Sequence, residues 1–403
     1  MAIQGNLIVG QSGGPTAVIN STLLGVIEEA VAHSEIEGIY GMLHGIRGVF
    51  DEEFADLRRE SKDTLAMLRH TPASALGTVR YKVRDAEYDR LIEVLKKWDI
   101  RYLFYIGGND SADTSLKMYK AALERGYELH VIGVPKTIDN DLPVTDHCPG
   151  YGSAARFVAS AVRDTAMDTE AMGSDGPVKL VEIMGRNAGW LAAAAALARQ
   201  TEGDPPHLIY VPEHPIIAEQ VVGDVSVVMH KHGYCVAAVS EGLLDAKTGK
   251  PFGEPLGPKQ KDAFGHEVKG GVVDAMADAI MDGLELRARL DKPGYLQRAC
   301  TALQSETDRE EAYAVGRAAV QAAVAGQSGQ MVTLVREPGA VYRVTTGLGP
   351  LEAIANVEHK LPPEYINARG NDVTRAFLNY ARPLIGGPLP PSARLATVRA
   401  VRT

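Results

Sequence analysis

The sequence has few of the features that mark cross-linked or membrane-spanning proteins. Its three cysteines, Cys148, Cys235 and Cys300, are odd in number and widely spaced. They fit neither a disulfide framework nor a CxxC metal site. Free thiols persist in a reducing compartment, so we expect a cytoplasmic protein. No run of 18 apolar residues is free of charge, and the first residues lack a basic stretch followed by a long apolar core. We therefore expect no membrane span and no signal peptide.

Positive charge is also scarce. The 403 residues carry 42 Lys and Arg against 51 Asp and Glu, a formal net charge of -9. This balance argues against a broad nucleic-acid or membrane surface, and any anionic ligand has to be held by a local basic cluster. The 11 histidines form no HExxH pattern, which argues against a metal site built by the protein alone. GxGxxG is also lacking, which argues against a dinucleotide-binding oxidoreductase.

Short apolar segments alternate with glycine-bearing loops and helical segments. Expected strands at residues 7–10, 103–106 and 179–183 each lead through a loop into an expected helix, near Thr16, at 113–125 and at 188–199. A fourth strand, 131–134, runs into a polar loop, and two more strands are expected at 208–211 and 234–239. This order is typical of an α/β protein with parallel sheets wound by helices. A change of character near Gly150 predicts a domain boundary there.

The most informative peptide, PKTIDND at residues 135–141, follows one of these strands. In open α/β sheets, ligands bind at the carboxyl ends of the strands. If the peptide is extended, Asp139 and Asp141 project to the same side. Two carboxylates that lie so close repel, so one of them gains proton affinity and can act as a base. An Asx-rich turn with helix caps would use the same residues.

Two glycine loops stand at other strand ends. Gly13-Gly14 and Gly107-Gly108 each precede an expected helix, where backbone N–H groups and the helix terminus favour a phosphate. A tight turn, or a helix cap supplied by Asn109, Asp110 or Ser111, is the alternative. Arg186 follows a further strand, and its planar fork suits a phosphoryl group, although a surface ion pair is also open.

Taken in order, these motifs resemble the phosphofructokinase family. The resemblance covers residues 7 to about 317 and rests on SGGP (12–15), GGND (107–110), PKTIDND (135–141), MGR (184–186), SEG (240–242) and PGYLQR (293–298). It implies two similar domains, each a mostly parallel sheet flanked by helices, with the active site in the cleft between them. Residues 1–150 with about 302–345 would bind the phosphoryl donor. Residues 151–301 with about 346–403 would bind the sugar phosphate. The resemblance also implies a homodimer or homotetramer.

The resemblance assigns roles to the motif residues. Asp139 would take the proton from the 1-hydroxyl of fructose 6-phosphate, and Arg186 would stabilise the moving phosphoryl group, which suits a reaction that depends on positioning and charge. The donor would be bound by Gly13, Gly14, Arg80, Lys82 and Gly108. The sugar phosphate would be bound by Thr137, Asp139, Asp141, Met184, Gly185, Arg186, Glu241, Arg289, Tyr295 and Arg298.

Two residues resemble the branch of the family that uses pyrophosphate. ATP-using members have glycines where this chain has Asp110 and Lys136. A carboxylate at Asp110 would repel the α-phosphate of a nucleotide. Lys136 would stabilise charge on a compact leaving group. We therefore expect reversible, pyrophosphate-dependent phosphorylation of fructose 6-phosphate to fructose 1,6-bisphosphate, in glycolysis and gluconeogenesis. An ATP-dependent sugar-phosphate kinase and a non-catalytic regulatory subunit are the alternatives.

The chain departs from the family pattern at two positions. Asn109 stands where the family has an aspartate that contacts magnesium, and an amide oxygen can bind Mg²⁺ without charge. We expect Mg²⁺ as cofactor, held by pyrophosphate itself and by Asp110 or a carboxylate of PKTIDND, with Asn109 as a candidate contact. Pro177 stands nearest to a family arginine that reaches a neighbouring subunit's sugar phosphate; either Lys179 replaces that arginine or the contact is absent.

Overall fold

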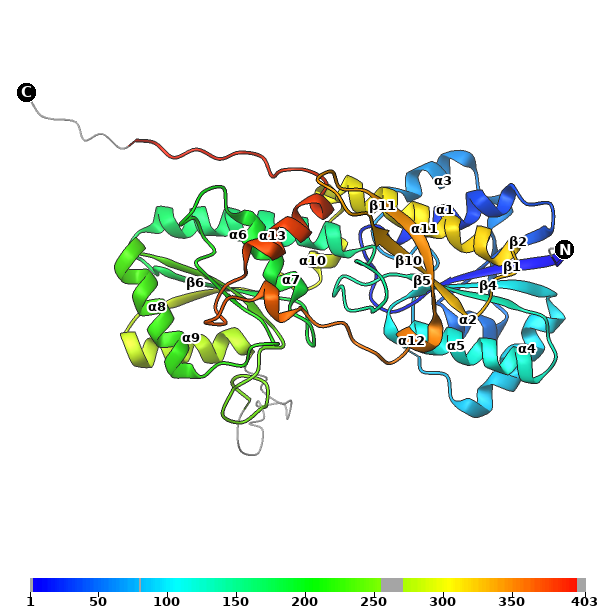
Figure 1. Ribbon diagram of the computed structural model, residues 1–403, viewed down its shortest axis with the longest axis horizontal. Coiled ribbons are helices and arrows are strands. Elements are labelled where there is room, and N and C mark those ends of the chain that lie inside the picture. Colours follow the sequence, from blue (N-terminus) through cyan, green and yellow to red (C-terminus); the bar gives the residue numbers. More distant parts are fainter. Residues whose placement is uncertain (1–2, 80, 255–270, 397–403) are drawn as a thin grey trace, which may run out of the picture.

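Two lobes lie side by side in the computed structural model, which describes residues 3–79, 81–254 and 271–396 (Figure 1). Each lobe is built around one sheet. The first has seven strands in the order β11-β10-β5-β4-β1-β2-β3, and the second has four in the order β7-β8-β6-β9. Arg80 and much of the loop that follows Ala246 lie outside the described residues.

The seven-stranded sheet is mostly parallel. Only β2–β3 and β10–β11 are antiparallel pairs. Side chains alternate across the sheet, so Leu7 and Val9 of β1 pack toward α1 and α11 while Ile8 packs toward α4 and α5. The strands are β1 (Gly5–Gln11), β2 (Ile36–Met42), β3 (Phe54–Asp56), β4 (Ile100–Gly107), β5 (His130–Pro135), β10 (Gln330–Arg336) and β11 (Val344–Pro350). The helices of this lobe are α1 (Ile19–Val31), α2 (Ile46–Asp51), α3 (Lys62–Leu68), α4 (Tyr88–Lys97), α5 (Asn109–Glu124), α11 (Glu306–Val324) and α12 (Leu351–Ile354).

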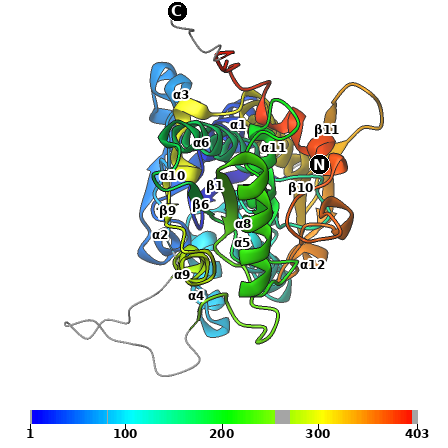
Figure 2. The same ribbon diagram turned by 90° about the vertical axis from the view of Figure 1, so that its left-hand side faces the viewer.

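The four-stranded sheet is parallel throughout and is covered on both faces. Leu180 of β6 packs with α8 and α9, whereas Val181 packs with α6 and α13. Figure 2 views this lobe end-on, with α8 and α9 in front. The strands are β6 (Val178–Ile183), β7 (Leu208–Tyr210), β8 (Cys235–Ser240) and β9 (Ala288–Asp291). The helices are α6 (Tyr151–Met172), α7 (Trp190–Ala193), α8 (Ala218–His232), α9 (Val272–Leu284), α10 (Leu296–Ala299) and α13 (Arg375–Ala381).

The predicted fold class is confirmed, while several element boundaries differ from those expected. Helix α5 begins at Asn109 rather than at 113, so Asn109 and Asp110 belong to its first turn. Helix α1 begins at Ile19 rather than near Thr16. The expected alanine-rich helix is a short α-helix followed by a 3₁₀ segment, Ala194–Ala198, with every residue buried.

The chain returns to the first lobe after it has built the second sheet. Helix α11 packs on α1, and β10 and β11 extend the first sheet beside β5. Because α12 packs with residues of α5 and β10, the return continues to Ile354 rather than ending near residue 345. We propose the two-domain division expected from the sequence, with this boundary moved from residue 345 to Ile354. The residues after Ile354 cross back to the second lobe.

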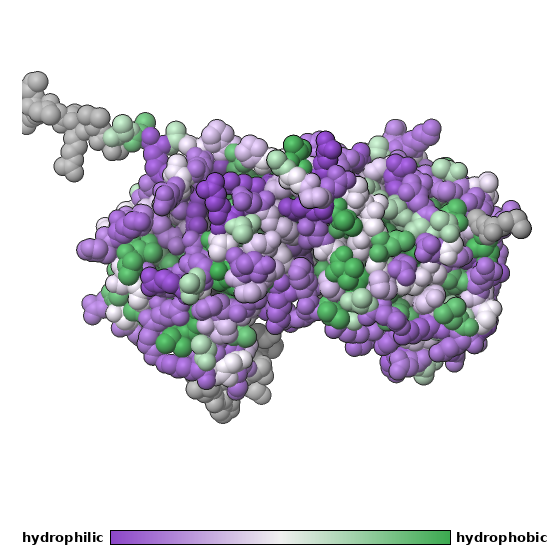
Figure 3. Space-filling view, viewed as in Figure 1, coloured by the Kyte–Doolittle hydropathy of each residue, from purple (hydrophilic) through white to green (hydrophobic). Residues whose placement is uncertain are grey.

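The surface in Figure 3 is mixed, with hydrophobic residues scattered among hydrophilic ones over both lobes. Within the described residues, we find no helix with both the length and the apolar character needed to cross a membrane.

Candidate active site

The loop after β5 turns sharply in the middle of the predicted catalytic peptide. Asn140 has a φ of 56°, in the left-handed region, so the peptide is not extended there. The buried Asn140 amide donates to the Tyr380 hydroxyl at 2.8 Å and accepts from the backbone N–H of Cys148 at 2.9 Å. The extended conformation under which strand alternation would align Asp139 and Asp141 is therefore not present. The turn nevertheless leaves both carboxylates lining one pocket.

This pocket has a volume of about 940 Å³ and gathers residues from segments far apart in the sequence. The loops after β1, β4 and β5 all contribute, which is the arrangement expected at the carboxyl ends of parallel strands. Of the residues predicted from the sequence, the pocket is lined by Gly13, Gly14, Lys82, Gly108, Asn109, Asp110, Lys136, Thr137, Asp139 and Asp141.

Two cations converge on the Gly13-Gly14 loop. The Lys136 side chain is buried, and its Nζ donates to the carbonyl oxygen of Gly14 at 2.7 Å. The Arg298 guanidinium also approaches Gly14, where a Cβ would lie 2.6 Å from one of its nitrogens. Burial lowers the pKa of Lys136 to about 8. The loop is therefore flanked by positive charge where a phosphate would lie against its backbone.

The carboxylate of Asp139 has the proton affinity of a base that works near neutral pH. Burial, together with the charges of Asp141 and Glu241, raises the pKa of Asp139 to about 6, with Lys136 and Arg298 acting in the opposite direction. Burial also raises the pKa of Asp141. Glu241 and Arg298 thus act on Asp139 across the space between the lobes, since both belong to the second lobe.

The amino end of α5 faces the pocket without a side-chain cap. Its N-cap residue is Gly108, and no side chain accepts from the first-turn N–H groups, so the helix-cap alternative is not observed. Asp110 is exposed in this first turn and lines the pocket. The Asn109 amide accepts from the backbone N–H of Asn356 and donates to the carbonyl of Val357, both at 2.5 Å. Asn109 is thus occupied on both sides by backbone, and its predicted contact with magnesium stays a prediction.

Three motifs meet at the carboxyl ends of β6 and β8. The backbone N–H of Met184 donates to the buried Gln297 side chain of PGYLQR at 3.1 Å. The Ser240 hydroxyl donates to the carbonyl of Gly185 at 2.6 Å. A Cβ on Gly242 would lie 1.8 Å from the carbonyl oxygen of Arg186, so glycine is required there. MGR, SEG and PGYLQR therefore form one assembled surface of the second lobe.

A family model for phosphofructokinase matches residues 6–323, which contain all six motifs. The chain belongs to the phosphofructokinase family. It is similar to proteins named pyrophosphate–fructose 6-phosphate 1-phosphotransferase. One, from Xanthomonas campestris pv. campestris (strain B100), is 44% identical over 392 residues, which cover 96% of this chain and 93% of that protein. Another, from Halomonas elongata, is 42% identical and covers 99% of this chain and 98% of its own length.

Solved structures agree with this family. A pyrophosphate-dependent phosphofructokinase from Nitrosospira multiformis superposes with a TM-score of 0.87 at 40% identity. The match covers 97% of this chain and 94% of that chain. The two-lobed α/β architecture of this chain is therefore the phosphofructokinase fold.

The remaining predicted residues of this phosphofructokinase lie at different distances from the pocket. Arg186 is exposed directly after β6, and the exposed Tyr295 ring lies 4.3 Å from the Arg298 guanidinium. Arg289 does not reach the pocket. Parallel pairing sets it opposite Lys179 at the amino end of β6, where it pairs with Asp168 at 3.4 Å. Arg80 lies outside the described residues.

Lys179 is not placed to replace the arginine that the family resemblance implies near Pro177. Its side chain is buried, and its Nζ pairs with Asp291 at 3.0 Å. The hypothesis that Lys179 reaches outward to a neighbouring subunit is therefore wrong, because the lysine neutralises a carboxylate of the adjacent strand.

Some pocket residues of this phosphofructokinase were not predicted. Asn187 directly follows MGR, so its position in the sequence could have indicated it. Asn356 and Glu358 belong to a late segment without any motif, and no pattern in the sequence indicates them. The other unpredicted lining residues include Ser12, Val79, Tyr81, Tyr105, Asp113 and Thr114.

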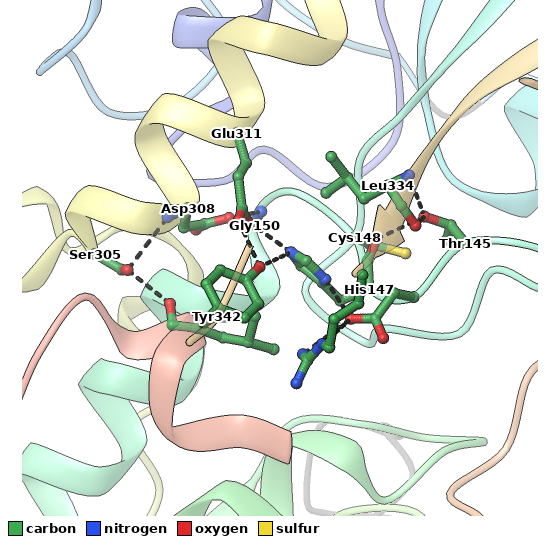
Figure 4. A network of polar contacts seen from close by, with 12 residues as sticks. Thr145, His147, Cys148, Gly150, Ser305, Asp308, Glu311, Leu334 and Tyr342 are labelled. Carbon is green, nitrogen blue, oxygen red and sulfur yellow. Dashed lines mark hydrogen bonds and ion pairs between the residues drawn. The ribbon is translucent and has the colours of Figure 1, made fainter. Parts of the chain in front are cut away.

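A buried polar network holds the chain that follows the PKTIDND peptide (Figure 4). His147 lies between Asp146, at 2.8 Å, and Glu311, at 2.6 Å. Burial alone would lower the pKa of His147, but the hydrogen bonds and charges of these two carboxylates raise it to about 9. Nearby, Asp308 accepts from the backbone N–H of Gly150 at 2.8 Å. Helix α11, part of the returning chain, thus anchors the polypeptide between the catalytic loop and α6.

Proposed function

We propose that this protein is a magnesium- and pyrophosphate-dependent phosphotransferase. It transfers a phosphoryl group to the 1-hydroxyl of fructose 6-phosphate and releases phosphate. Proteins named pyrophosphate–fructose 6-phosphate 1-phosphotransferase are similar to this chain over nearly their whole length. The observation that carries the proposal is that Lys136 and Asp110 line the same pocket as Asp139. Pyrophosphate and the sugar phosphate product are similar in phosphoryl energy, so the reaction is reversible.

The donor end of the pocket suits pyrophosphate. The loop at Gly13-Gly14, the uncapped amino end of α5 at Gly108 and the cation of Lys136 offer N–H groups and positive charge to a compact anion. The donor site also includes Lys82 and Arg80. Asp110 opposes the additional phosphate of a nucleotide, because like charges in a confined site repel.

Transfer itself needs a base, an aligned acceptor and charge stabilisation. Asp139 removes the proton of the sugar 1-hydroxyl, since its raised pKa lies close to neutral pH. Lys136 and Arg186 stabilise the charge on the leaving and moving phosphoryl groups. Thr137, Asp141 and the main chain at Met184 and Gly185 contact the sugar. Glu241, Tyr295 and Arg298 bind its hydroxyls and phosphate, and Arg289 contributes only if an assembly brings it to a site.

The charge of the pocket calls for a divalent cation. Its lining includes five carboxylates (Asp110, Asp113, Asp139, Asp141 and Glu358) against two lysines (Lys82 and Lys136). A pyrophosphate anion would be repelled there unless a cation accompanies it. Mg²⁺ binds through one or two carboxylates together with substrate phosphates. Within the residues that the structure describes, no group of three or more His, Cys, Asp or Glu is placed to hold a metal by itself. Asp110 and Asp141 fit the role of partners to a magnesium ion that pyrophosphate brings.

The deciding experiment compares donors with the purified protein alone. Initial rates are measured with pyrophosphate and with ATP at saturating fructose 6-phosphate and Mg²⁺. We expect turnover with pyrophosphate and little with ATP. A clear preference for ATP would refute the donor assignment. Absence of turnover with either donor would favour the regulatory-subunit alternative. The proposal also includes a cytoplasmic homodimer or homotetramer in glycolysis and gluconeogenesis, which light scattering and cell fractionation would test.

A further inference from the structure

Residues 356–361, here called the strap, cross from the first lobe to the second. The strap leaves α12 in the first lobe and reaches the second lobe beneath α7 (Figure 1). It lies beyond the part of the chain that the family model matches, which ends at residue 323. Its Asn356 and Glu358 side chains nevertheless line the pocket between the lobes.

The first lobe holds the strap at two site loops. At the amino end of α5, which directly follows β4, the Asn109 amide makes the two backbone hydrogen bonds already described, and the Asn356 side chain donates to Asp113 at 2.9 Å. At the loop after β5, the carbonyl oxygen of Asp141 accepts from the backbone N–H of His359 at 2.7 Å. The strap therefore connects the first turn of α5 to the loop after β5.

The second lobe holds the strap at the loop after β6. Asn187, which directly follows MGR, donates to Glu358 at 2.5 Å. The Trp190 indole donates to the carbonyl of His359 at 3.0 Å. The carboxylate of Glu213 accepts from the backbone N–H groups of both Leu361, at 2.9 Å, and Gly189, also at 2.9 Å. The strap and the MGR loop thus share one set of hydrogen bonds.

We propose that the strap is a positioning element that holds the loops after β4, β5 and β6 in the single arrangement that supports phosphoryl transfer. This inference rests on the proposed function. Gly108 and Asp110 of the donor site directly follow β4, the base lies on the loop after β5 and Arg186 on the loop after β6, so transfer depends on how the two lobes present them. A misplacement of about 1 Å between reacting groups can cost ~10²-fold in rate.

The inference gives Asn109 a role different from a magnesium contact, and Asn109→Asp separates the two. An aspartate keeps the acceptor for the N–H of Asn356. It loses the N–H group that donates to the Val357 carbonyl. A carboxylate oxygen then faces that carbonyl oxygen, which in the wild-type protein lies 2.5 Å from the Asn109 amide nitrogen. If Asn109 positions the strap, kcat falls about tenfold or more while the half-saturating Mg²⁺ concentration is unchanged. If residue 109 chiefly binds Mg²⁺, the aspartate lowers that concentration and preserves kcat, which overturns the inference.

The second anchor is tested at Glu358. Glu358→Ala removes the acceptor for Asn187, and we expect kcat to fall about fivefold or more with the KM for fructose 6-phosphate within about twofold. Glu358→Gln keeps an oxygen that accepts from Asn187, so it should recover activity relative to Glu358→Ala. The double variant Asn109→Asp/Glu358→Ala should lose less than the product of the single losses, because both changes release one segment. Glu364→Gln, an exposed carboxylate beyond the strap, is the matched control. A folded Glu358→Ala protein with wild-type kcat, or fully multiplicative losses, overturns the inference.

If the wild-type protein shows no turnover with pyrophosphate, the proposed function fails. A measurement that needs no substrate still tests the inference in that case. Amide hydrogen exchange is measured by mass spectrometry on full-length wild-type protein and on Glu358→Ala. The Glu358→Ala substitution removes a contact between the strap and the second lobe. We expect faster exchange, by about tenfold, in peptides that cover residues 107–112 and 139–142 of the first lobe. Unchanged exchange in both peptides contradicts the coupling that the strap is inferred to provide.

Discussion

Replacing Lys136 with methionine should make the protein more stable and less active. The lysine is buried, and its pKa falls from the ordinary value of 10.5 to about 8 because burial disfavours the charged ammonium. At 1.36 kcal/mol per pH unit, this difference corresponds to ~3 kcal/mol of destabilisation at neutral pH. Loss of the hydrogen bond to Gly14 offsets about 1 kcal/mol of the gain. The expected result is a net stabilisation of ~2 kcal/mol.

The pH dependence of this gain has a defined sign. Because the folded pKa lies below the unfolded value, the folded state binds fewer protons between pH 8 and 10.5, and the stability of the wild-type protein rises across that window. The advantage of Lys136→Met should therefore be full below pH 8 and shrink toward pH 10. Activity should fall by about 10²–10³-fold, the usual loss when a group that stabilises transition-state charge is removed.

Urea denaturation at pH 7 and pH 10 and initial rates with pyrophosphate measure these effects on the full-length protein. Lys62→Met, which removes an exposed lysine of α3, is the control and should change neither quantity appreciably. If Lys136→Met loses stability together with activity, the lysine is a structural residue, and the reasoning from its burial and its place in the donor pocket is refuted.

Three further predictions concern donor choice, the base and the buried histidine. Asp110→Gly should lower pyrophosphate turnover and admit some ATP, measured as the ratio of kcat/KM for the two donors. Wild-type kcat/KM should rise through pH 6 as Asp139 loses its proton, and fall above pH 8 as Lys136 loses its proton. Asp139→Ser should lower kcat by about 10²–10⁴-fold with little change in KM. The same variant should lose the rise of kcat/KM through pH 6. His147 should stabilise the fold fully below pH 6.5 and lose that effect as pH rises toward 9, so the melting temperature of His147→Gln should fall less across this window.

Each of these predictions has an outcome that contradicts it. No gain of nucleotide use by Asp110→Gly argues against the charge clash. Near-normal rates for Asp139→Ser remove Asp139 as the base. If the melting temperatures of wild type and His147→Gln change equally between pH 6.5 and 9, the carboxylates on either side of the histidine do not hold it charged.

The sequence predicts the fold class and the donor side of the site because both depend on local patterns. Apolar strands followed by glycine loops determine a parallel sheet, and parallel strands bring their carboxyl ends together. Gly13, Gly108, Lys136 and Asp139 therefore converge as expected. The shape of the catalytic loop was not predictable in this way. The left-handed conformation of Asn140 depends on hydrogen bonds from Cys148 and to Tyr380, one of them 240 residues away.

The second lobe shows where motif-based expectations end. Arg289 and Arg298 belong to the same stretch of sequence, yet of these two only Arg298 approaches the Gly13-Gly14 loop. The register of β9 against β6 fixes Arg289 at the amino end of the strand pair, and register is a property of the folded sheet. The strap carries no sequence signal, because its contacts depend chiefly on backbone groups that every residue possesses.

The returning chain has a consequence for synthesis on the ribosome. The sheet of the second lobe uses residues 178–291 and can be completed as soon as that stretch has emerged. The sheet of the first lobe has to wait for β10 and β11, although most of its strands are made earlier. Until residue 330 emerges, the edge of β5 that later pairs with β10 has no partner, and an unpaired strand edge is a site of aggregation. The sheet that is begun first is therefore completed last, and a chain interrupted before β10 should depend on chaperones to remain in solution.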